Sequence, residues 1–369
     1  MKTIAVTGAS GFIGKNLIVR LGENGYKPLP IVRDLDLDAL AEKLAEADFV
    51  VHLAGVNRPE HEDDFETGNA GMSERLASAL LLLNRPVPLV YSSSIQAELD
   101  NPYGRSKRSA EEALTGYGEA SGAPVHIWRL PNVFGKWCRP NYNSVVATFC
   151  HNIIQDLPIS IKDPAAGLRL VYIDDVVEAV LKLIAADGAL SVAVEPVYET
   201  TLGDLARTIE ALRDSRHTLV TGSVGRGFKR ALHATYLSYL RPEAFAYPLT
   251  THTDPRGTFA EMLRTPDAGQ FSFFTAHPGI TRGGHYHHSK TEKFLVVQGK
   301  ASFGFRHILT NETYTLETRG DLPQIVETVP GWSHDVTNIG EDTLIVMLWA
   351  NEVFDREKPD TFAAEVLPQ

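Results

Sequence analysis

The pattern of hydrophobic and polar positions changes character partway along the chain. In the first part, short apolar runs alternate with longer stretches whose apolar residues recur every three or four positions. The runs at 3–6, 29–32, 48–53 and 88–91 predict buried strands, and the stretches between them predict helices. Strands that alternate with helices are typical of a parallel sheet covered on both faces. Residues 1–245 are therefore predicted to form an α/β domain.

The rest of the chain, residues 246–369, has short alternating runs separated by turn residues. A polar, aromatic stretch at about 242–255, which contains three prolines, is the predicted linker. The predicted strands after it are 271–274, 293–297, 301–306, 312–316, 324–328 and 343–349. This spacing predicts a small, all-β antiparallel barrel or sandwich.

Composition narrows the class of protein. The 369 residues suit two domains, and a hydrophobic content of 43% is ordinary for a globular protein. A net charge of -11 without a long basic run argues against nucleic-acid binding. No uncharged apolar run reaches about 18 residues, so we expect no membrane-spanning helix. Cys138 and Cys150 are predicted to be free thiols. With no apparent signal peptide, this favours a cytoplasmic location.

A glycine-rich stretch, Thr7-Gly-Ala-Ser-Gly-Phe-Ile-Gly14, separates the first predicted strand from a helix at 15–21. Strand, glycine turn and helix in this order are typical of a dinucleotide site. Gly8 would allow the tight turn, Gly11 the approach of the pyrophosphate, and Gly14 close helix–strand packing. The free N–H groups of the helix N-terminus would hold the pyrophosphate. The cofactor residues expected here are Gly8, Ser10, Gly11, Phe12, Ile13 and Gly14.

Arg33 follows the second predicted strand, where a carboxylate would bind the ribose 2′-hydroxyl of NAD. A cation at this position suits a 2′-phosphate instead, so the sequence favours NADP(H). The alternative is a solvated arginine in a loop.

Three serines end the predicted strand at 88–94, and Tyr103 and Lys107 follow four residues apart. On a helix this spacing puts the phenol and the ammonium on one face. Because a nearby ammonium favours the phenolate, we expect Lys107 to lower the pKa of Tyr103. The phenol could then exchange a proton near neutral pH, while a serine hydroxyl holds a carbonyl oxygen. Ala54 and Gly55, at another strand end, should also lie beside the cofactor.

These residues resemble the extended short-chain dehydrogenase/reductase family, which has a Rossmann-like fold and acts on nucleotide sugars. The matching motifs are Thr7 to Gly14, His52-Leu-Ala-Gly55, Ser92 to Ser94, Tyr103 with Lys107, Arg129-Leu-Pro-Asn-Val-Phe-Gly135 and Tyr172-Ile-Asp-Asp-Val176. The resemblance implies that Ser94, Tyr103 and Lys107 are catalytic, transferring hydride to or from a sugar ketone. It also implies that Leu53 and Ala54, with Tyr103 and Lys107, contact the cofactor.

The same resemblance places Asn132 in the sugar-nucleotide pocket and Asn69 near the active site. Arg169 and Arg226 are candidate phosphate partners because a guanidinium matches phosphate geometry, with a surface position as the alternative for each. The gap between the serines and Tyr103 is shorter than in many relatives, so the rim of the pocket should differ.

In the second part, His285, His287, Glu292 and His334 predict a metal site. Alternate residues of a strand share a side, so His285 and His287 can converge, and neighbouring strands can add the other two. Three imidazoles and a carboxylate suit zinc or another divalent ion. The alternatives are solvated surface histidines or a lost site.

The spacing Gly279-x5-His285-x-His287-x4-Glu292-x6-Gly299 is similar to the first cupin motif, and Pro330-Gly-x-x-His334-x3-Asn338 resembles the second. The resemblance implies a jelly-roll barrel with His285, His287, Glu292 and His334 as ligands. His288 could displace His287. Asp254-x-Arg-Gly-x-Phe-x-Glu261 and Thr281-Arg-Gly-Gly-His285 are also similar to segments of nucleotide-sugar 3,5-epimerases, which are cupins.

A reductase followed by a cupin is similar to the bifunctional enzymes of UDP-N-acetyl-L-fucosamine synthesis, which serve capsule or O-antigen formation. The resemblance implies that the cupin inverts C3 of a UDP-2-acetamido-2,6-dideoxy-4-hexulose, with His288 or Lys293 as candidate base. The first domain would then reduce the C4 ketone with NADPH to UDP-2-acetamido-2,6-dideoxy-L-talose. It also implies a homodimer.

Two other interpretations stay open. In one, the cupin is only a structural, dimerisation or sugar-binding module beside a working keto-sugar reductase. In the other, the chain is an NADP-sensing regulator with an inactive reductase fold. The intact ligand set argues against the first, and the retained Ser94, Tyr103 and Lys107 argue against the second.

Overall fold

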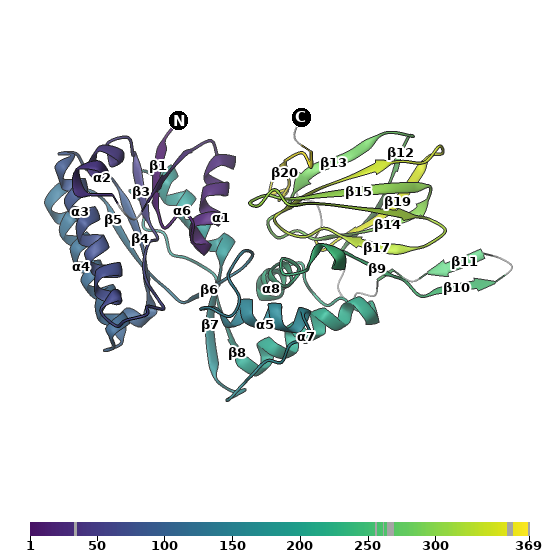
Figure 1. The fold of residues 1–369 in the computed structure, drawn as a ribbon, viewed down its shortest axis with the longest axis horizontal. Coiled ribbons are helices and arrows are strands. Elements are labelled where there is room, and N and C mark those ends of the chain that lie inside the picture. The colour runs from purple at the N-terminus through teal and green to yellow at the C-terminus, as the bar shows by residue number, and fades with distance from the viewer. Residues whose placement is uncertain (33–34, 255–256, 261, 264–268, 353–356, 368–369) are drawn as a thin grey trace. The chain divides into compact units, whose positions relative to one another are not determined.

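The computed structural model describes residues 1–32, 35–254, 257–260, 262–263, 269–352 and 357–367. The chain divides into two compact units (Figure 1). The first unit holds residues 1–144 and 167–200, and the second holds residues 145–166 and 201–369.

The first unit is built on a five-stranded sheet in the order β2-β1-β3-β4-β5. Its strands are β1 (Thr3–Thr7), β2 (Lys27–Ile31), β3 (Phe49–His52), β4 (Leu89–Ser94) and β5 (Val125–Leu130). All neighbouring strands run parallel, and Ile4 pairs with Pro28 on one side and with Phe49 on the other. β1 and β3 are buried along their whole length, which explains their unbroken apolar runs. The predicted α/β fold is confirmed.

Helices cover both faces of this sheet (Figure 1). On one face α3 packs against both α2 and α4, and on the other α1 packs against α6. The bounds are α1 (Phe12–Glu23), α2 (Leu37–Leu44), the π-helix η1 (Glu66–Gly71), α3 (Met72–Leu82), the 3-10 helix η2 (Ile95–Glu98), α4 (Pro102–Ser121) and α6 (Ile173–Ala185). A smaller sheet has the order β6-β7-β8, formed by β6 (Asn132–Phe134), β7 (Gly167–Tyr172) and β8 (Val197–Thr201).

The second unit contains two antiparallel five-stranded sheets, as a cupin-like jelly roll requires. The first has the order β12-β19-β14-β17-β9, formed by β9 (Ala246–Pro248), β12 (Gln270–Ala276), β14 (Glu292–Gln298), β17 (Gln324–Glu327) and β19 (Leu344–Ala350). The second has the order β16-β15-β18-β13-β20, formed by β13 (Thr281–Tyr286), β15 (Lys300–His307), β16 (Thr313–Arg319), β18 (Trp332–Asn338) and β20 (Phe362–Ala363). A separate ribbon pairs β10 (Thr251–Asp254) with β11 (Gly257–Ala260). The predicted all-β cupin fold is confirmed, although the six predicted strand ranges do not include β9, β10, β11, β13, β18 or β20.

Helices also belong to the second unit. They are α5 (Val145–Ile154), α7 (Leu202–Thr218), α8 (Gly227–Leu237) and the 3-10 helix η3 (Pro242–Ala244). Leu212 on α7 and Val224 join an apolar cluster with Leu295, Ile325 and Trp349 of the first barrel sheet. Residues 145–166 and 201–245 therefore belong to the same compact unit as the barrel. The domain boundary at residue 245 stays a prediction.

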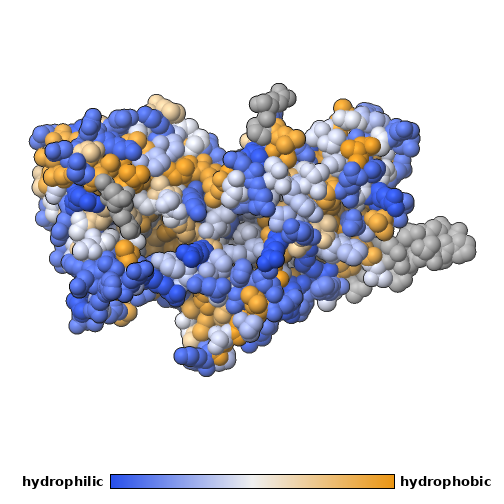
Figure 2. All heavy atoms as spheres, viewed as in Figure 1, coloured by the Kyte–Doolittle hydropathy of each residue, from blue (hydrophilic) through white to orange (hydrophobic). Residues whose placement is uncertain are grey.

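The surface of the two units mixes polar and apolar residues. On the face shown in Figure 2, hydrophilic residues surround the hydrophobic patches of each unit. Within the described ranges, no helix is both long enough and apolar enough to cross a membrane.

Candidate active site and metal centre

The glycine loop between β1 and α1 is tightly packed. Gly8 has φ +67°, and a Cβ on it would lie 2.8 Å from the Ala54 nitrogen. A Cβ on Gly14 would lie 2.2 Å from the Gly8 carbonyl oxygen, so Gly14 packs against the loop itself. Helix α1 begins at Phe12, and Gly11 at its N-cap makes no side-chain cap. Its first N–H groups can therefore face an anion.

A buried polar network joins this loop to the next strand. The backbone N–H groups of Leu53 and Ala54 each donate to the Thr7 hydroxyl at 3.1 Å. His52 lies between that hydroxyl and Ser73, with its ring nitrogens 2.6 and 2.9 Å from the two oxygens. Burial, with the charge of Lys107, lowers the pKa of His52 to about 3, so the ring is neutral. The network holds Leu53 and Ala54 at the end of β3, where the cofactor was predicted.

Arg33, the residue that favoured NADP(H), lies outside the described residues. The choice between NAD and NADP therefore stays a prediction.

The three predicted catalytic residues come together at the end of β4 and the start of α4. Asn101 caps α4 by accepting from the Gly104 N–H at 2.7 Å. Tyr103 and Lys107 follow in the first two turns, and the Tyr103 phenol shares a hydrogen bond with the hydroxyl of Ser94. The serine hydroxyl and the phenol can thus hold one carbonyl oxygen between them.

The expectation that Lys107 lowers the pKa of Tyr103 is wrong for this structure. Burial raises the pKa of Tyr103, and the hydrogen bond with Ser94 opposes that rise. The Lys107 ammonium is engaged elsewhere: it donates to the Ser92 carbonyl at 3.0 Å and lies 4.4 Å from the centre of the Tyr91 ring. Burial lowers the pKa of Lys107 to about 8. A phenol that keeps its proton at neutral pH is in the form needed to protonate a reduced ketone.

Glu111 and Arg129 fix the serine run and were not predicted as site residues. The Glu111 carboxylate accepts from the Ser93 hydroxyl and, at 2.7 Å, from Nη2 of Arg129. Ser92 meanwhile binds the lysine through its carbonyl, and Ser94 faces the tyrosine. Each serine therefore has a different partner. The one sequence signal was the four-residue spacing that puts Glu111 on the face of Lys107.

Asn69, in the π-helix η1, supports the catalytic helix. Its side chain accepts from the Val56 N–H at 2.8 Å, donates to the Val56 carbonyl at 3.0 Å, and donates to the Ser106 hydroxyl at 3.0 Å. Ser106 in turn donates to the Tyr103 carbonyl at 2.9 Å. This buried asparagine thus ties the loop after β3 to the backbone of Tyr103.

A cavity of about 600 Å³ opens beside Ala54 and Gly55. Arg58, Arg75 and Tyr142 also line it, and the Arg58 guanidinium lies 5.7 Å from the centre of the Tyr142 ring. Two guanidinium groups suit a phosphorylated ligand. The sequence analysis did not single out these residues.

The predicted substrate residues lie on the smaller sheet of the first unit. Asn132 starts β6 and is paired with Leu170, next to Arg169 on β7. Both Asn132 and Arg169 are exposed, and the Arg169 guanidinium is 4.0 Å from the Glu199 carboxylate. Arg226 is the exposed N-cap of α8 in the second unit. Their binding roles stay predictions.

In the second unit the structure brings together the four predicted metal ligands His285, His287, Glu292 and His334. One donor atom from each lies within 4.8 Å of the others. A Glu292 oxygen is 3.2 Å from His287 Nε2 and 3.5 Å from His334 Nε2. Imidazole nitrogens and carboxylate oxygens are atoms that zinc and similar ions bind.

Electrostatics favour a cation at this cluster. Burial lowers the pKa of His285 to about 3, helped by the neighbouring imidazoles, and burial also lowers the pKa of His334. Burial alone would raise the pKa of Glu292, but hydrogen bonds from His287 and His334 hold it well below its usual range. Neutral imidazoles and an ionised carboxylate are the forms that bind a divalent metal. The donor set therefore fits zinc or a similar ion.

His288 and Lys293 do not join the cluster. The His288 ring packs 5.0 Å from the ring of Phe362, between centroids. The buried Lys293 ammonium pairs with Glu327 and donates to the Tyr247 hydroxyl at 2.9 Å. Because neighbours on a strand face opposite sides, Lys293 points away from the ligand Glu292. Lys293 is therefore not positioned to act as a base inside the barrel.

Family comparisons agree with this two-part architecture. Residues 4–193 match the NAD dependent epimerase/dehydratase family, and residues 252–362 match the polysaccharide biosynthesis C-terminal domain. The first match spans just over half of the chain, so the protein belongs to the NAD dependent epimerase/dehydratase family, which implies a nicotinamide cofactor.

Individual relatives extend the match along the whole chain. The protein is 56% identical over 366 residues to the UDP-2-acetamido-2,6-beta-L-arabino-hexul-4-ose reductase of Pseudomonas aeruginosa, covering 98% of each chain. It is similar to the crystal structure of the capsular polysaccharide assembling protein CapF from Staphylococcus aureus, with a TM-score of 0.67, 40% identity, and coverage of 98% of this chain and 100% of that one. The UDP-N-acetylglucosamine 4-epimerase of Bacillus cereus, at 19% identity and a TM-score of 0.54 over 64% of this chain and 96% of that one, shares the fold. The predicted relationship to capsular polysaccharide enzymes that join a reductase domain to a cupin domain is confirmed.

Proposed function

We propose that the first unit reduces the C4 ketone of a UDP-activated 4-keto amino sugar. The observation that carries this proposal is the grouping of Ser94, Tyr103 and Lys107 at the end of β4, beside a glycine loop. The reduced nicotinamide supplies the hydride. Ser94 and Tyr103 orient the carbonyl oxygen, and Tyr103 donates its proton to that oxygen as the alcohol forms. The Lys107 ammonium donates to the Ser92 carbonyl and so helps to hold the strand end that carries Ser94.

The substrate class in this proposal rests on the relatives. The Pseudomonas aeruginosa relative is named UDP-2-acetamido-2,6-beta-L-arabino-hexul-4-ose reductase, and 56% identity supports a similar substrate here. The expected product is UDP-2-acetamido-2,6-dideoxy-L-talose. The polysaccharide biosynthesis domain and the likeness to CapF support a role in capsule or O-antigen polysaccharide synthesis. NADPH as the reductant rests on Arg33 alone.

We further propose that the cupin unit epimerises C3 of the same sugar before reduction. His285, His287, Glu292 and His334 would hold zinc or another divalent ion, which supplies positive charge to stabilise an enolate. A chain base must then remove the C3 proton, and His288 stays the candidate. Reduction at C4 removes the ketone that makes this proton acidic, so the new configuration is fixed.

A second candidate gives the cupin only a structural or dimerisation role. The buried pairing of Glu327 with both Lys293 and Arg216, which joins α7 to the barrel, supports a structural contribution. Homodimerisation and a cytoplasmic location are further expectations from resemblance and composition.

Proton NMR in heavy water separates the two candidates. The 4-keto UDP-sugar is incubated with the full chain without NADPH. Epimerase chemistry predicts deuterium at C3, and Glu292→Gln should abolish its entry while the exposed control Glu317→Gln does not. A C3 proton that never exchanges, while NADPH is still consumed when added, would leave the cupin with a structural or binding role.

A further inference from the structure

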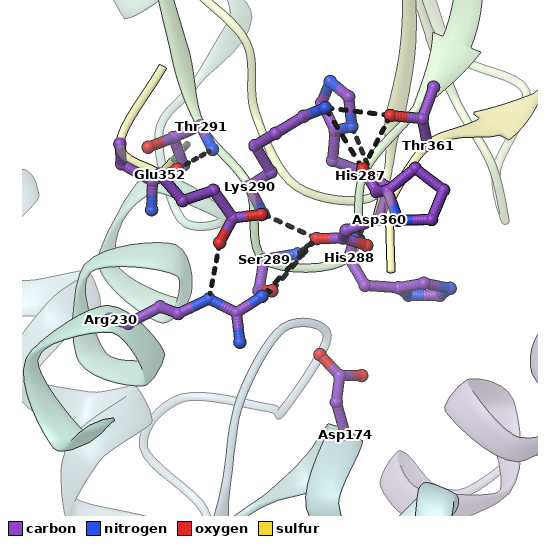
Figure 3. Close-up of polar contacts among 12 residues, drawn as sticks. Asp174, Arg230, His287, His288, Ser289, Lys290, Thr291, Glu352, Asp360 and Thr361 are labelled. Atoms are coloured by element: carbon purple, nitrogen blue, oxygen red, sulfur yellow. Dashed lines mark hydrogen bonds and ion pairs between the residues drawn. The ribbon is translucent and has the colours of Figure 1, made fainter. Parts of the chain in front are cut away.

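Asp360 lies beside the candidate metal ligands, although 73 residues separate it from His287. Its carboxylate accepts from three consecutive backbone N–H groups, those of His288 at 2.9 Å, Ser289 at 2.8 Å and Lys290 at 2.7 Å. The Ser289 hydroxyl adds a fourth hydrogen bond at 3.0 Å. Figure 3 shows the carboxylate beside this turn. One side chain therefore fixes the backbone that directly follows His287.

The main chain of Asp360 contacts the ligand itself. Its carbonyl oxygen lies 2.5 Å from Nδ1 of His287. A carbonyl can only accept, so Nδ1 must carry the proton. Nε2, which lies 3.2 Å from the Glu292 carboxylate, is then the ring nitrogen that is left to bind a metal. The hydrogen bond to the Asp360 carbonyl thus orients the His287 ring so that Nε2 faces the other ligands.

A short strand brings Asp360 to this place. β20 begins two residues later and pairs with β13, with Phe362 opposite Tyr286 and Ala363 opposite the ligand His285. Asp360 itself has φ +39°, a left-handed conformation that aspartate, asparagine and glycine tolerate best. The segment before β20 is therefore held against the strand that carries the first ligand.

Two cations support the arrangement (Figure 3). Arg230 on α8 donates to the Ser289 hydroxyl and lies 3.8 Å from the Asp360 carboxylate. Its Nε is 3.2 Å from the Glu352 carboxylate, which orients the guanidinium. Lys290 donates to the Pro359 carbonyl at 3.2 Å and to the Thr361 hydroxyl at 2.8 Å. The turn and the C-terminal segment thus hold each other on both sides of Asp360.

We propose that Asp360 is a positioning residue for the metal centre. Its carboxylate sets the turn after His287, and its carbonyl fixes the Nδ1–H tautomer of that imidazole. This assignment rests on the proposed metal-binding role of the cupin unit. In this proposal the C-terminal segment orients one metal ligand, His287.

Metal affinity tests the carboxylate. Asp360→Gly keeps the left-handed backbone and the carbonyl but removes the carboxylate, whereas Asp360→Asn keeps the shape and replaces one acceptor oxygen with a donor. Zinc affinity, measured on the full chain by competition with a chromophoric chelator, should fall about 10- to 100-fold in both variants. The visible spectrum of the Co²⁺-loaded protein should also differ between these variants and the wild-type chain. Asp321→Asn, an exposed carboxylate paired with Arg319, should change neither.

The tautomer is tested in the metal-free wild-type protein, where no variant has to fold. A two-bond 15N–1H spectrum of the imidazoles, with the His287 signal assigned by His287→Gln, should show Nδ1 protonated. An Nδ1 without a proton, or Asp360 variants with wild-type zinc affinity and cobalt spectrum, would overturn the proposal. If the wild-type chain bound neither zinc nor cobalt, the proposed metal site itself would be wrong. The protonation of Nδ1 would then test only whether Asp360 orients the His287 ring.

Discussion

Lys293 and Glu327 form a buried ion pair on the side of strand β14 opposite to the metal ligand Glu292. Glu327 also accepts from Arg216 on α7. Although burial opposes each charge, Lys293 holds the pKa of Glu327 below its usual range, and Glu327 raises the pKa of Lys293. Both groups therefore stay charged, and their contact joins the helices of the second unit to its barrel.

Removing one partner of this pair should cost stability. Lys293→Ala leaves the Glu327 carboxylate with one cation fewer in a buried site, so we expect the free energy of unfolding to fall by about 3–5 kcal/mol. Denaturant unfolding followed by tryptophan fluorescence measures this, because Trp332 and Trp349 lie in the barrel. Lys300→Ala, which breaks an exposed pair with Glu317, should cost less than about 1 kcal/mol. Equal costs for the two variants would contradict this account.

Tyr103→Phe should remove the proton donor and leave the fold intact. We expect kcat for keto-sugar reduction to fall by about 10²- to 10⁴-fold, because the forming alkoxide loses its acid. Binding of NADPH, followed by fluorescence titration, should change little. Tyr26→Phe, at the start of β2 and remote from β4, serves as the control. A Tyr103→Phe enzyme with the wild-type rate would show that the phenol is not the acid.

The buried charge of Lys107 should lower the free energy of unfolding near neutral pH. Burial lowers its pKa to about 8, below the ordinary value of 10.5. Between these values the unfolded chain binds more protons than the folded chain, so stability rises with pH across this window. Lys107→Met should therefore raise the free energy of unfolding near pH 7 by about 1–3 kcal/mol, and the gain should shrink by about pH 10.

Urea unfolding at the two pH values measures this gain, with Lys43→Met on α2 as the control. The same substitution should slow reduction, because the end of β4 that carries Ser94 loses its contact with the Lys107 ammonium. If the gain in the free energy of unfolding were the same at both pH values, the lowered pKa of Lys107 would be contradicted.

Metal removal should separate the proposed epimerisation from the proposed reduction. Prolonged dialysis against a chelator is expected to abolish exchange of the C3 proton, because the enolate loses its stabilising charge. NADPH binding to the first unit should persist, since its glycine loop contains no metal ligand. Re-addition of zinc should restore exchange to the wild-type chain but not to Glu292→Gln. Full exchange after complete metal removal would exclude a metal role in the proposed epimerisation.

The features that could be predicted from the sequence are those encoded within a few residues. The glycine loop, the four-residue spacing of Tyr103 and Lys107, and the alternation of His285 and His287 all express local geometry. Glu292 and His334 could be added because their spacing matched a known pattern of motifs.

The features that escaped prediction depend on contacts between distant segments. Asp360 meets the His287 turn only because β20 pairs with β13, and so short a strand has no recognisable period. Arg129 reaches Glu111 from a neighbouring strand, and α7 packs on the barrel through the buried Arg216–Glu327 pair. The direction of the Tyr103 pKa shift was missed because burial, which only the fold determines, raises that pKa, and because the Lys107 ammonium contacts the Ser92 carbonyl instead.

The proposed function depends above all on hydride transfer to C4 of a UDP-linked keto sugar. The most direct test uses NADPH deuterated at the transferable position, with the 4-keto UDP-sugar as substrate and mass spectrometry and NMR of the product. We expect one deuterium at C4 of the reduced sugar, and almost none with Tyr103→Phe in the same time. Oxidation of the cofactor without deuterium at C4, or no reaction of the wild-type enzyme with this sugar, would contradict it.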